Sequence, residues 1–122
     1  MRSSTVETMS CVAESVRVSR NALSVELSDG RMIAAPLAWF PRLLHATRAE
    51  RENWRFIARG HGIHWEGIDE DISVANLLAG RASDESQASF KKWLESRAAR
   101  RLAAGKRRLA AVKSRRRAGA SR

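Results

Sequence analysis

The sequence predicts an α+β protein: a small antiparallel sheet of three to four strands with short helices, followed by a long basic C-terminal helix. The first observation is the alternation of apolar and polar residues over residues 15–27, which is typical of half-buried strands. The second is a series of helix caps, prolines and glycines that divides residues 36–80 into short segments. The third is the helical spacing of apolar residues after residue 83, where the chain also becomes strongly basic.

These patterns divide the 122 residues into three parts. Residues 1–12 are mostly small and polar and are predicted to be a flexible leader. Residues 13–82 hold enough apolar side chains for one small folded α+β domain, and the polar stretch RASDESQ marks its end. Residues 83–122 are predicted to form a basic helical tail, which we expect to be frayed or disordered at its end because few apolar residues remain there.

Two strands and a hairpin turn come first in the predicted domain. Val16 and Val18 lie on one face of the first strand, and the segment ALSVEL alternates again in the second. The dipeptide Asp29-Gly30 favours a tight hairpin turn, because glycine readily adopts a positive φ. The third strand follows over RMIAAPL. Pro36 marks its end or an edge of the sheet, since proline cannot donate a hydrogen bond to a neighbouring strand.

Helix signals dominate the middle of the domain. Pro41 suits the first turn of a short helix, where no backbone N–H is needed. Thr47 and Glu50 match a capping box, in which each side chain accepts a hydrogen bond from the backbone N–H of the other residue. We expect the helix that Thr47 opens to run to about Ala58, and Gly60 to end it.

The domain ends with a fourth strand and a last short helix. The strand GIHWEG, residues 62–67, lies between glycines. Asp71 or Ser73 is expected to cap the helix VANLLAG, which Gly80 ends.

Five aromatic residues are expected in the core of the domain, because large rings supply the volume that a small domain needs. They are Trp39, Phe40, Trp54, Phe56 and Trp65. A surface on which nucleic-acid bases stack is the alternative interpretation of the same rings.

The stretch HGIHWEGIDEDIS, residues 61–73, concentrates histidines and acids and raises the question of a metal or catalytic site. His61 and His64 are three residues apart and would point to opposite faces of a strand, so they do not converge on a metal ion. The acids at residues 69–71 are consecutive and are expected to cap the following helix instead. Cys11 has no base nearby in the sequence, and the glycines form no phosphate-binding loop. We therefore expect no catalytic residues, no metal ligands, no cofactor and no enzymatic activity.

The net charge of +10 is concentrated in the last quarter of the chain. Residues 1–90 carry ten Arg or Lys and twelve Asp or Glu, a net charge of −2, whereas residues 91–122 carry thirteen Arg or Lys and one Glu, a net charge of +12. A segment this basic binds polyanions by releasing their counterions. The predicted nucleic-acid-binding residues are Arg100, Arg101, Lys106, Arg107, Arg108, Lys113, Arg115, Arg116 and Arg117.

Two other interpretations of the tail remain open. It could be a solvated charged end that only aids solubility, or an amphipathic helix that docks on an acidic partner protein through Phe90, Trp93, Leu94 and Leu102. A single cysteine excludes an internal disulfide, and no apolar run is long enough to span a bilayer. We therefore expect a cytoplasmic protein that does not contact a membrane.

Four stretches of the domain form a distinctive set: Asp29-Gly30-Arg31, PLAWFPRL at residues 36–43, RENW at residues 51–54, and above all GHGIHWEGIDEDISVANLLAG at residues 60–80. Through these stretches, much of residues 15–80 resembles a family of small bacterial domains of unknown function. The resemblance implies a compact α+β domain with an antiparallel sheet and brings no catalytic residues. Members of the family are often encoded beside a second small protein in pairs that look like toxin–antitoxin operons, which implies a protein partner encoded nearby. Some relatives append a helix-turn-helix domain, and the basic helix of this chain departs from that pattern.

The resemblance and the charge together predict a non-enzymatic interaction module. In this hypothesis an antitoxin-like domain contacts a second small protein, and the basic tail contacts nucleic acid. The first alternative is an accessory nucleic-acid-binding protein without a protein partner. The second is a metal-dependent hydrolase that uses His61, His64 and the acids at residues 69–71.

Overall fold

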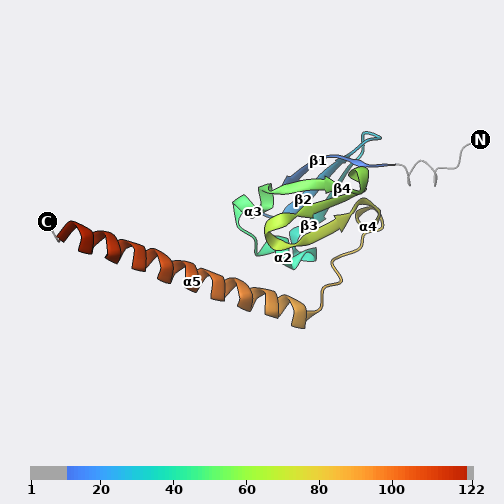
Figure 1. Cartoon of the computed structure of the whole chain (residues 1–122). Coiled ribbons are helices and arrows are strands. Elements are labelled where there is room, and N and C mark those ends of the chain that lie inside the picture. The colour runs from blue at the N-terminus through green and yellow to red at the C-terminus, as the bar shows by residue number, and fades with distance from the viewer. Residues whose placement is uncertain (1–10, 121–122) are drawn as a thin grey trace, which may run out of the picture. The chain divides into compact units, whose positions relative to one another are not determined.

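The computed structural model describes residues 11–120, with side chains described as far as residue 111. The chain forms two units, Met1–Asp84 and Glu85–Arg122. The described part of the first unit is an α+β domain, and that of the second is a single long helix (Figure 1). The α+β class predicted from the sequence is confirmed.

The first sheet is a meander of three antiparallel strands, β1 (Ala13–Val18), β2 (Ala22–Leu27) and β3 (Met32–Pro36), with β2 in the centre. The predicted turn between β2 and β3 is present, and Gly30 has the positive φ, 91°, that such a turn requires. The alternation predicted for β2 is also confirmed. Its inward side chains are at most 1% exposed, and they are Leu23, Val25 and Leu27.

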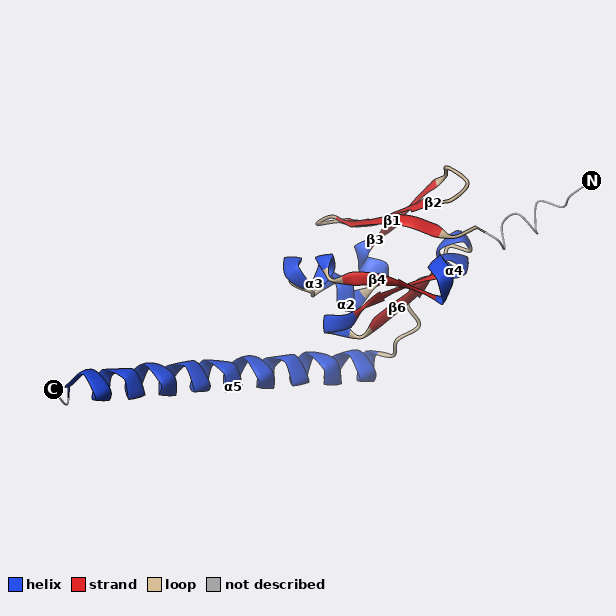
Figure 2. Ribbon diagram, turned by 45° about the horizontal axis from the view of Figure 1, so that its top comes forward, coloured by secondary structure: helices blue, strands red, loops and turns tan. Residues whose placement is uncertain are grey.

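The second sheet consists of β4 (Trp54–Ile57), β5 (Gly62–Trp65) and β6 (Glu70–Ser73), again antiparallel and with the middle strand in the centre. The strand predicted within residues 62–67 is β5, and β4 and β6 are additional to the predicted strands. The central strand buries Ile63 and Trp65 completely. Figure 2 shows the two sheets as separate layers. The buried side chains of β2 and β5 supply the centre of the core.

The helix predicted from Thr47 to Ala58 is confirmed at its start and wrong in its second half. The Thr47 hydroxyl accepts a hydrogen bond from the Glu50 backbone N–H at 3.1 Å, and the Glu50 carboxylate accepts one from the Thr47 backbone N–H at 2.8 Å. The helix α3 nevertheless spans only Arg48–Glu52. It stops because WRFI is rich in the aromatic and β-branched residues that favour strands, and it pairs as β4 with GIHW. Gly60 lies in the turn between β4 and β5, with a φ of 90°, and ends no long helix.

Short helices connect the strands. The 3₁₀ turn η1 (Leu37–Trp39) and the helix α2 (Pro41–Leu44) follow β3, and Pro41 occupies the first turn of α2 as predicted. The turns η2 (Ala58–Gly60) and η3 (Glu66–Ile68) join the strands of the second sheet, and α4 (Val74–Leu78) follows β6. Figures 1 and 2 both place α3 and α4 at opposite ends of the domain.

The prediction that the acids at residues 69–71 cap the following helix is wrong. Glu70 and Asp71 lie inside β6, and Asp69 adopts a left-handed conformation with a φ of 50°. Ser73 caps α4, because its hydroxyl accepts a hydrogen bond from the Asn76 backbone N–H at 3.0 Å. Asp71 is drawn away from a capping role by the pairing of β6 with β5.

The five aromatic residues expected in the core divide between core and surface. Phe40 and Trp65 are 3% and 0% exposed, whereas Trp39 and Phe56 are 36% and 37% exposed. Trp54 is half-buried, and its ring centroid lies 5.0 Å from that of Phe56. Trp54 and Phe56 share the core-facing side of the sheet with the buried residues of β5, but β4 is an edge strand and leaves both rings partly open to solvent.

The described part of the chain begins at residue 11. Residues 1–10 of the predicted leader lie outside the described residues. Cys11 is buried, and its sulfur accepts a weak hydrogen bond from the Ser28 hydroxyl at 3.8 Å. The Val12 backbone N–H donates to the same hydroxyl at 3.1 Å, so these two positions are part of the domain.

The helix α5 (Gln87–Ala120) is continuous over 34 residues and therefore about 50 Å long. It is capped at its start, because the Ser86 hydroxyl accepts a hydrogen bond from the Ser89 backbone N–H at 3.1 Å. It passes through Gly105 without interruption. The predicted fraying of the end of the tail concerns residues whose side chains lie outside the described range, and it stays a prediction.

Candidate functional site

His64 lies in a row of charged residues that crosses the outer face of the second sheet. In the strand register, Arg55 of β4 is opposite His64, and His64 is opposite Asp71 of β6. The Asp71 carboxylate bonds to Nδ1 of His64, and Oε2 of Glu66 lies 2.9 Å from Nε2. Arg55 completes the row through an ion pair of 3.6 Å between its Nη2 and Oε2 of Glu66. Only 15% of the His64 side chain is exposed.

The two carboxylates raise the pKa of His64. The hydrogen bond to Asp71 is the largest cause, partial desolvation opposes it, and the hydrogen bond to Glu66 and the charges of both acids add to the rise. The imidazolium form donates both of its ring N–H groups, one to each carboxylate. Neither nitrogen then offers a lone pair, so His64 is poorly placed to act as a general base or a metal ligand.

The other candidates for chemistry lie apart from this row. His45 and His61 are exposed, and the buried Cys11 contacts Ser28. In the described part of the chain, no group of three or more His, Cys, Asp or Glu residues is placed to hold a metal ion. The stretch at residues 61–73 is therefore a pair of strands with a connecting turn, in which His64 bonds to Asp71 and Glu66.

A cavity of about 300 Å³ opens between the edge strand β6 and the linker at residues 81–84. All four residues of β6 line one side, and all four residues of the linker line the other. Phe40 and Ile72, which are 3% and 4% exposed, form the apolar floor of the cavity. We call this cavity the β6 groove.

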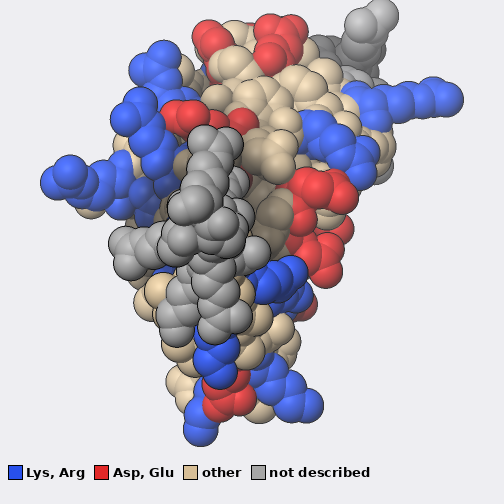
Figure 3. Space-filling view, turned by 60° about the vertical axis from the view of Figure 1, so that its left-hand side comes forward, with Lys and Arg blue, Asp and Glu red and all other residues tan. Residues whose placement is uncertain are grey.

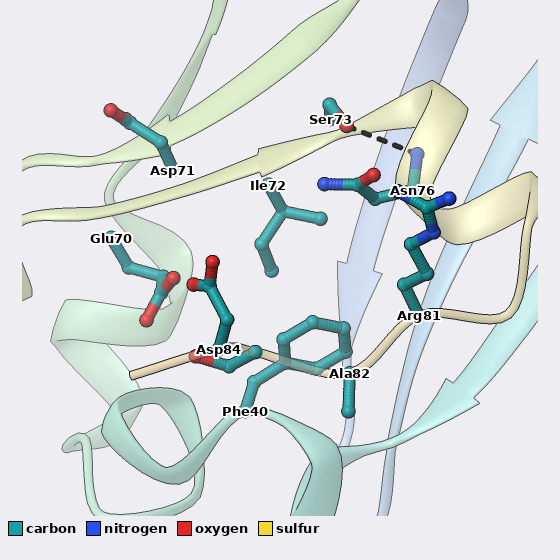
Figure 4. Close-up of a pocket in the computed structure, with 10 residues that line it drawn as sticks. Phe40, Glu70, Asp71, Ile72, Ser73, Asn76, Arg81, Ala82 and Asp84 are labelled. Carbon is teal, nitrogen blue, oxygen red and sulfur yellow. Dashed lines mark hydrogen bonds between the residues drawn. The ribbon is translucent and has the colours of Figure 1, made fainter. Parts of the chain in front are cut away.

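The β6 groove has ends of opposite character. In Figure 4, the carboxylates of Glu70 and Asp84 lie near each other at one end, and the side chain of Arg81 reaches toward Asn76 at the other. Phe40 lies between these ends. The groove thus combines an apolar floor with an acidic end and a basic end.

The linker that forms the far wall is bonded to the domain. The Arg81 backbone N–H donates to the Asn76 carbonyl at 2.9 Å, and the Ser83 backbone N–H donates to the Trp39 carbonyl at 2.9 Å. Sequence reasoning missed the groove because the stretch RASDESQ indicates only a domain boundary. No periodicity marks a linker that folds back beside a strand, although charges of both signs within this stretch are a weak signal.

The helix α5 carries all of the predicted nucleic-acid-binding residues. Its described members are exposed, and they are Arg100, Arg101, Lys106, Arg107 and Arg108. The remaining four lie on the same helix outside the range of described side chains, and they are Lys113, Arg115, Arg116 and Arg117. Successive residues of a helix are turned by about 100°, so these positions surround the helix and form no single stripe.

The apolar residues predicted as a docking stripe on α5 fall into two groups. Phe90 stacks on Trp93 with ring centroids 5.7 Å apart, and Cζ of Arg97 lies 4.6 Å from the centroid of the Trp93 ring. These three side chains and that of Leu94 are half-buried. Leu102 is separate from them, with 67% of its surface exposed.

Charge is distributed differently over the two units. Met1–Asp84 carries ten Arg or Lys and eleven Asp or Glu, a net charge of −1, and Glu85–Arg122 carries thirteen Arg or Lys and two Glu, a net charge of +11. The face shown in Figure 3 presents basic and acidic groups interspersed with each other. Among the described residues, no helix is both long enough and apolar enough to cross a bilayer.

Two solved structures are similar to this chain. A protein of unknown function from Rhodospirillum rubrum is 28% identical, with a TM-score of 0.54, over 64% of this chain and 94% of its own. An uncharacterised protein from Chromobacterium violaceum is 20% identical, with a TM-score of 0.54, over 66% of this chain and 76% of its own. The second likeness concerns the fold alone. No curated protein matches the sequence.

A family model matches residues 13–83, which is more than half of the chain. The matched range begins with β1 and ends inside the linker, so it contains both sheets, the row around His64 and nearly all of the β6 groove. The helix α5 lies beyond it. The chain therefore belongs to the family described as Protein of unknown function (DUF2442).

Proposed function

We propose that this protein is a non-enzymatic, antitoxin-like interaction module, in which the α+β domain contacts a second small protein and α5 contacts nucleic acid. The observation that carries the proposal is the separation of charge between the two units. Met1–Asp84 has a net charge of −1, and Glu85–Arg122 has a net charge of +11. A nearly neutral domain is suited to a protein partner, and a helix this basic is suited to a polyanion.

Nucleic acid matches α5 in charge and in length. A helix of about 50 Å spans about one and a half turns of duplex DNA, whose turns repeat every 34–36 Å. Arg outnumbers Lys nine to four over residues 91–122, and the planar guanidinium donates two parallel hydrogen bonds to a phosphate. Because the cations surround the helix, they favour contact with phosphates over the reading of base edges.

The proposed contact between the domain and a protein partner has separate support. The family resemblance implies a second small protein encoded nearby. Met32, Trp39 and Phe56 leave 67%, 36% and 37% of their surfaces exposed on the domain, and aromatic residues and Met are enriched at protein interfaces. An accessory nucleic-acid-binding protein without a partner, the alternative, would leave these side chains without a role. Co-expression with the products of adjacent genes separates the two, because only the first predicts co-purification in a fixed ratio.

The proposed contact between α5 and nucleic acid predicts that the affinity of the protein for nucleic acid depends on α5. In the full chain, replacing Arg100, Arg101, Arg107 and Arg108 with Gln should lower the slope of log K against log salt by up to about 3–4 for a duplex, because each lost phosphate contact contributes about 0.9. Fluorescence anisotropy with a labelled duplex at several salt concentrations measures the slope. A labelled single strand of RNA, treated in the same way, compares the two kinds of nucleic acid.

The matched control removes the same charge from the domain. Arg17, Arg20, Arg48 and Arg59 are all exposed there, and their replacement with Gln should change the slope by less than about one. Equal losses from the two quadruple variants would show that net charge, and not the helix, drives binding. That result would overturn the assignment of nucleic-acid contact to α5.

A further inference from the structure

We infer that the β6 groove is a docking site for an extended segment of a partner protein, which adds to the second sheet as a strand beside β6 and carries a basic side chain to the acidic end. This inference rests on the proposed function, because the segment that binds in the groove belongs to the proposed protein partner. It goes further because it names the binding surface, the conformation of the bound segment and the charge of that segment.

The backbone of β6 offers hydrogen bonds toward the groove. The Val74 N–H donates to the His61 carbonyl at 2.9 Å, which fixes the phase of the pairing between β5 and β6. In an antiparallel pair, residues that exchange hydrogen bonds alternate with residues that do not. Asp71 and Ser73 are therefore the residues of β6 that direct their N–H and C=O groups away from β5. No strand in the described part of the chain pairs with this edge.

The groove has the shape that an added strand needs. A new strand would lie about 4.8 Å from β6, inside a cavity of about 300 Å³ that is bounded on its far side by the bonded linker. Side chains alternate along a strand, so every second side chain of the added segment would lie over Phe40 and Ile72. The others would point to the outer face of the sheet. Recognition of this kind draws affinity from backbone hydrogen bonds and specificity from alternate side chains.

Charge selects the occupant. The side chains that line the groove include the carboxylates of Glu70 and Asp84 and the guanidinium of Arg81, whereas the Asp71 carboxylate bonds to His64 on the outer face of the sheet. A second copy of the chain would bring its own β6, with Glu70 and Asp71, against this lining. Residues 1–10 contain one Arg and one Glu and are neutral overall. A basic segment from a different protein is the occupant that complements the groove, and nucleic acid is disfavoured by its own negative charge.

The test uses a short peptide as the probe for the full chain. The pentapeptide acetyl-Thr-Val-Lys-Arg-Thr-amide alternates an apolar and a basic side chain on one face. Two-dimensional ¹⁵N–¹H NMR should show the amides of Asp71 and Ser73 shifting on addition of the peptide up to millimolar concentration. Two control peptides should shift them at least about tenfold less at equal concentration: one with Glu in place of Lys and Arg, and one N-methylated at its first threonine and its lysine.

A pair of variants at one position isolates the backbone hydrogen bond. Ser73→Pro and Ser73→Ala both remove the hydroxyl that caps α4, but only proline also removes the N–H that faces the groove. Ser73 has a φ of −91° and extended geometry, so proline, whose ring fixes φ at about −65°, requires a shift of the backbone at this N-cap. Ser73→Ala should bind the peptide as the wild type does, and Ser73→Pro should bind at least about tenfold more weakly.

A second pair isolates the charge. Asp84→Lys reverses a charge in the groove, and Glu14→Lys makes the same change on the exposed surface of β1. The first should weaken peptide binding several-fold, and the second should leave it unchanged. This pair does not touch the core, so it keeps the test open if Ser73→Pro fails to fold.

Three results would overturn the inference. The first is an absence of shifts at Asp71 and Ser73 at millimolar peptide, and the second is equal binding of the N-methylated peptide. The third is a dimer, seen by sedimentation, that Ser73→Pro dissociates and Ser73→Ala does not, because the edge would then pair with a second copy. The peptide does not involve the basic helix. If the peptide does not bind, the salt-slope test of α5 is therefore unaffected. If the salt-slope test fails, the inference about the β6 groove is likewise unaffected.

Discussion

The His64 side chain joins β5 to β6 through Asp71 and to the η3 turn through Glu66, and its protonation state should therefore affect the stability of the fold. Asp71 and Glu66 hold the pKa of His64 above its ordinary value, so the folded protein binds this proton more tightly than the unfolded chain does. The stabilisation is fully present below pH about 6.5, the ordinary value for histidine, and is lost as the pH rises through the raised pKa of the folded state. Urea unfolding of the wild type and of His64→Gln over a series of pH values measures it. The difference in unfolding free energy should be largest at the acidic end.

Asp71→Asn provides the control for this prediction. It removes the largest cause of the raised pKa and keeps a side chain of nearly the same shape. In that background, the difference between His64 and Gln should depend less on pH, and the NMR titration of the His64 ring should move to lower pH. A difference that is constant with pH in the wild-type background would contradict the assignment of the shift to these carboxylates.

Trp65 shows what a single buried residue contributes to the domain. Its side chain is 0% exposed, and its Nε1–H donates to the Arg51 carbonyl at 3.1 Å. Trp65→Phe removes ring volume and leaves that carbonyl without its partner, so the free energy of unfolding should fall by about 2–4 kcal/mol. Trp54→Phe, at a half-buried position, should cost less than about 1.5 kcal/mol. Urea unfolding measures both, and equal losses would show that the two rings are equally important to the core.

At the scale of the elements, local signals in the sequence were sufficient for part of the fold. The Asp29-Gly30 turn, Pro41 at the start of α2 and the capping box of Thr47 and Glu50 each depend on the chemistry of a few adjacent residues. These features form because the required residue supplies its own backbone conformation or hydrogen bond. They could therefore be predicted without knowledge of distant contacts.

The strands β4 and β6 required information that local patterns do not contain. Each has only four residues, and each is a strand because it pairs with β5. The segment Trp54–Ile57 follows a capped helix and could continue that helix by local preference. It forms a strand instead because it pairs with β5. Asp71 has a side chain that caps helices well, yet it bonds to His64 across the sheet. Pairing between distant segments overrides local preference in both places.

The candidate sites divide in the same way. The basic residues of α5 could be named from composition, because charge density does not depend on the fold. The β6 groove could not, since it assembles residue 40, the strand at residues 70–73 and the linker at residues 81–84. The arrangement of these segments follows from tertiary contacts such as the bond between the Ser83 N–H and the Trp39 carbonyl.

At the scale of the whole molecule, the domain should fold without the helix. Among the residues that the structure describes, the buried apolar side chains all lie within residues 11–77. The match to the similar structure from Rhodospirillum rubrum covers 64% of this chain and 94% of that protein. That protein is therefore a chain of about the size of the domain. Ending the chain after Ser86 should therefore leave the thermal midpoint within about 4 °C of the full-length value. Circular dichroism during heating measures it, and loss of a cooperative transition would show that α5 is needed for folding.

The linker at residues 81–84 has one more consequence. Ser83 is bonded to the domain, and only residues 84–86 separate it from Gln87, the first residue of α5, so this tether extends at most about 14 Å. Because this tether is short, each unit stays at a high effective concentration near the other. A partner that connects a weak ligand of one unit to a weak ligand of the other would therefore bind with strong avidity. Lengthening the tether would weaken such bivalent binding without altering either binding surface.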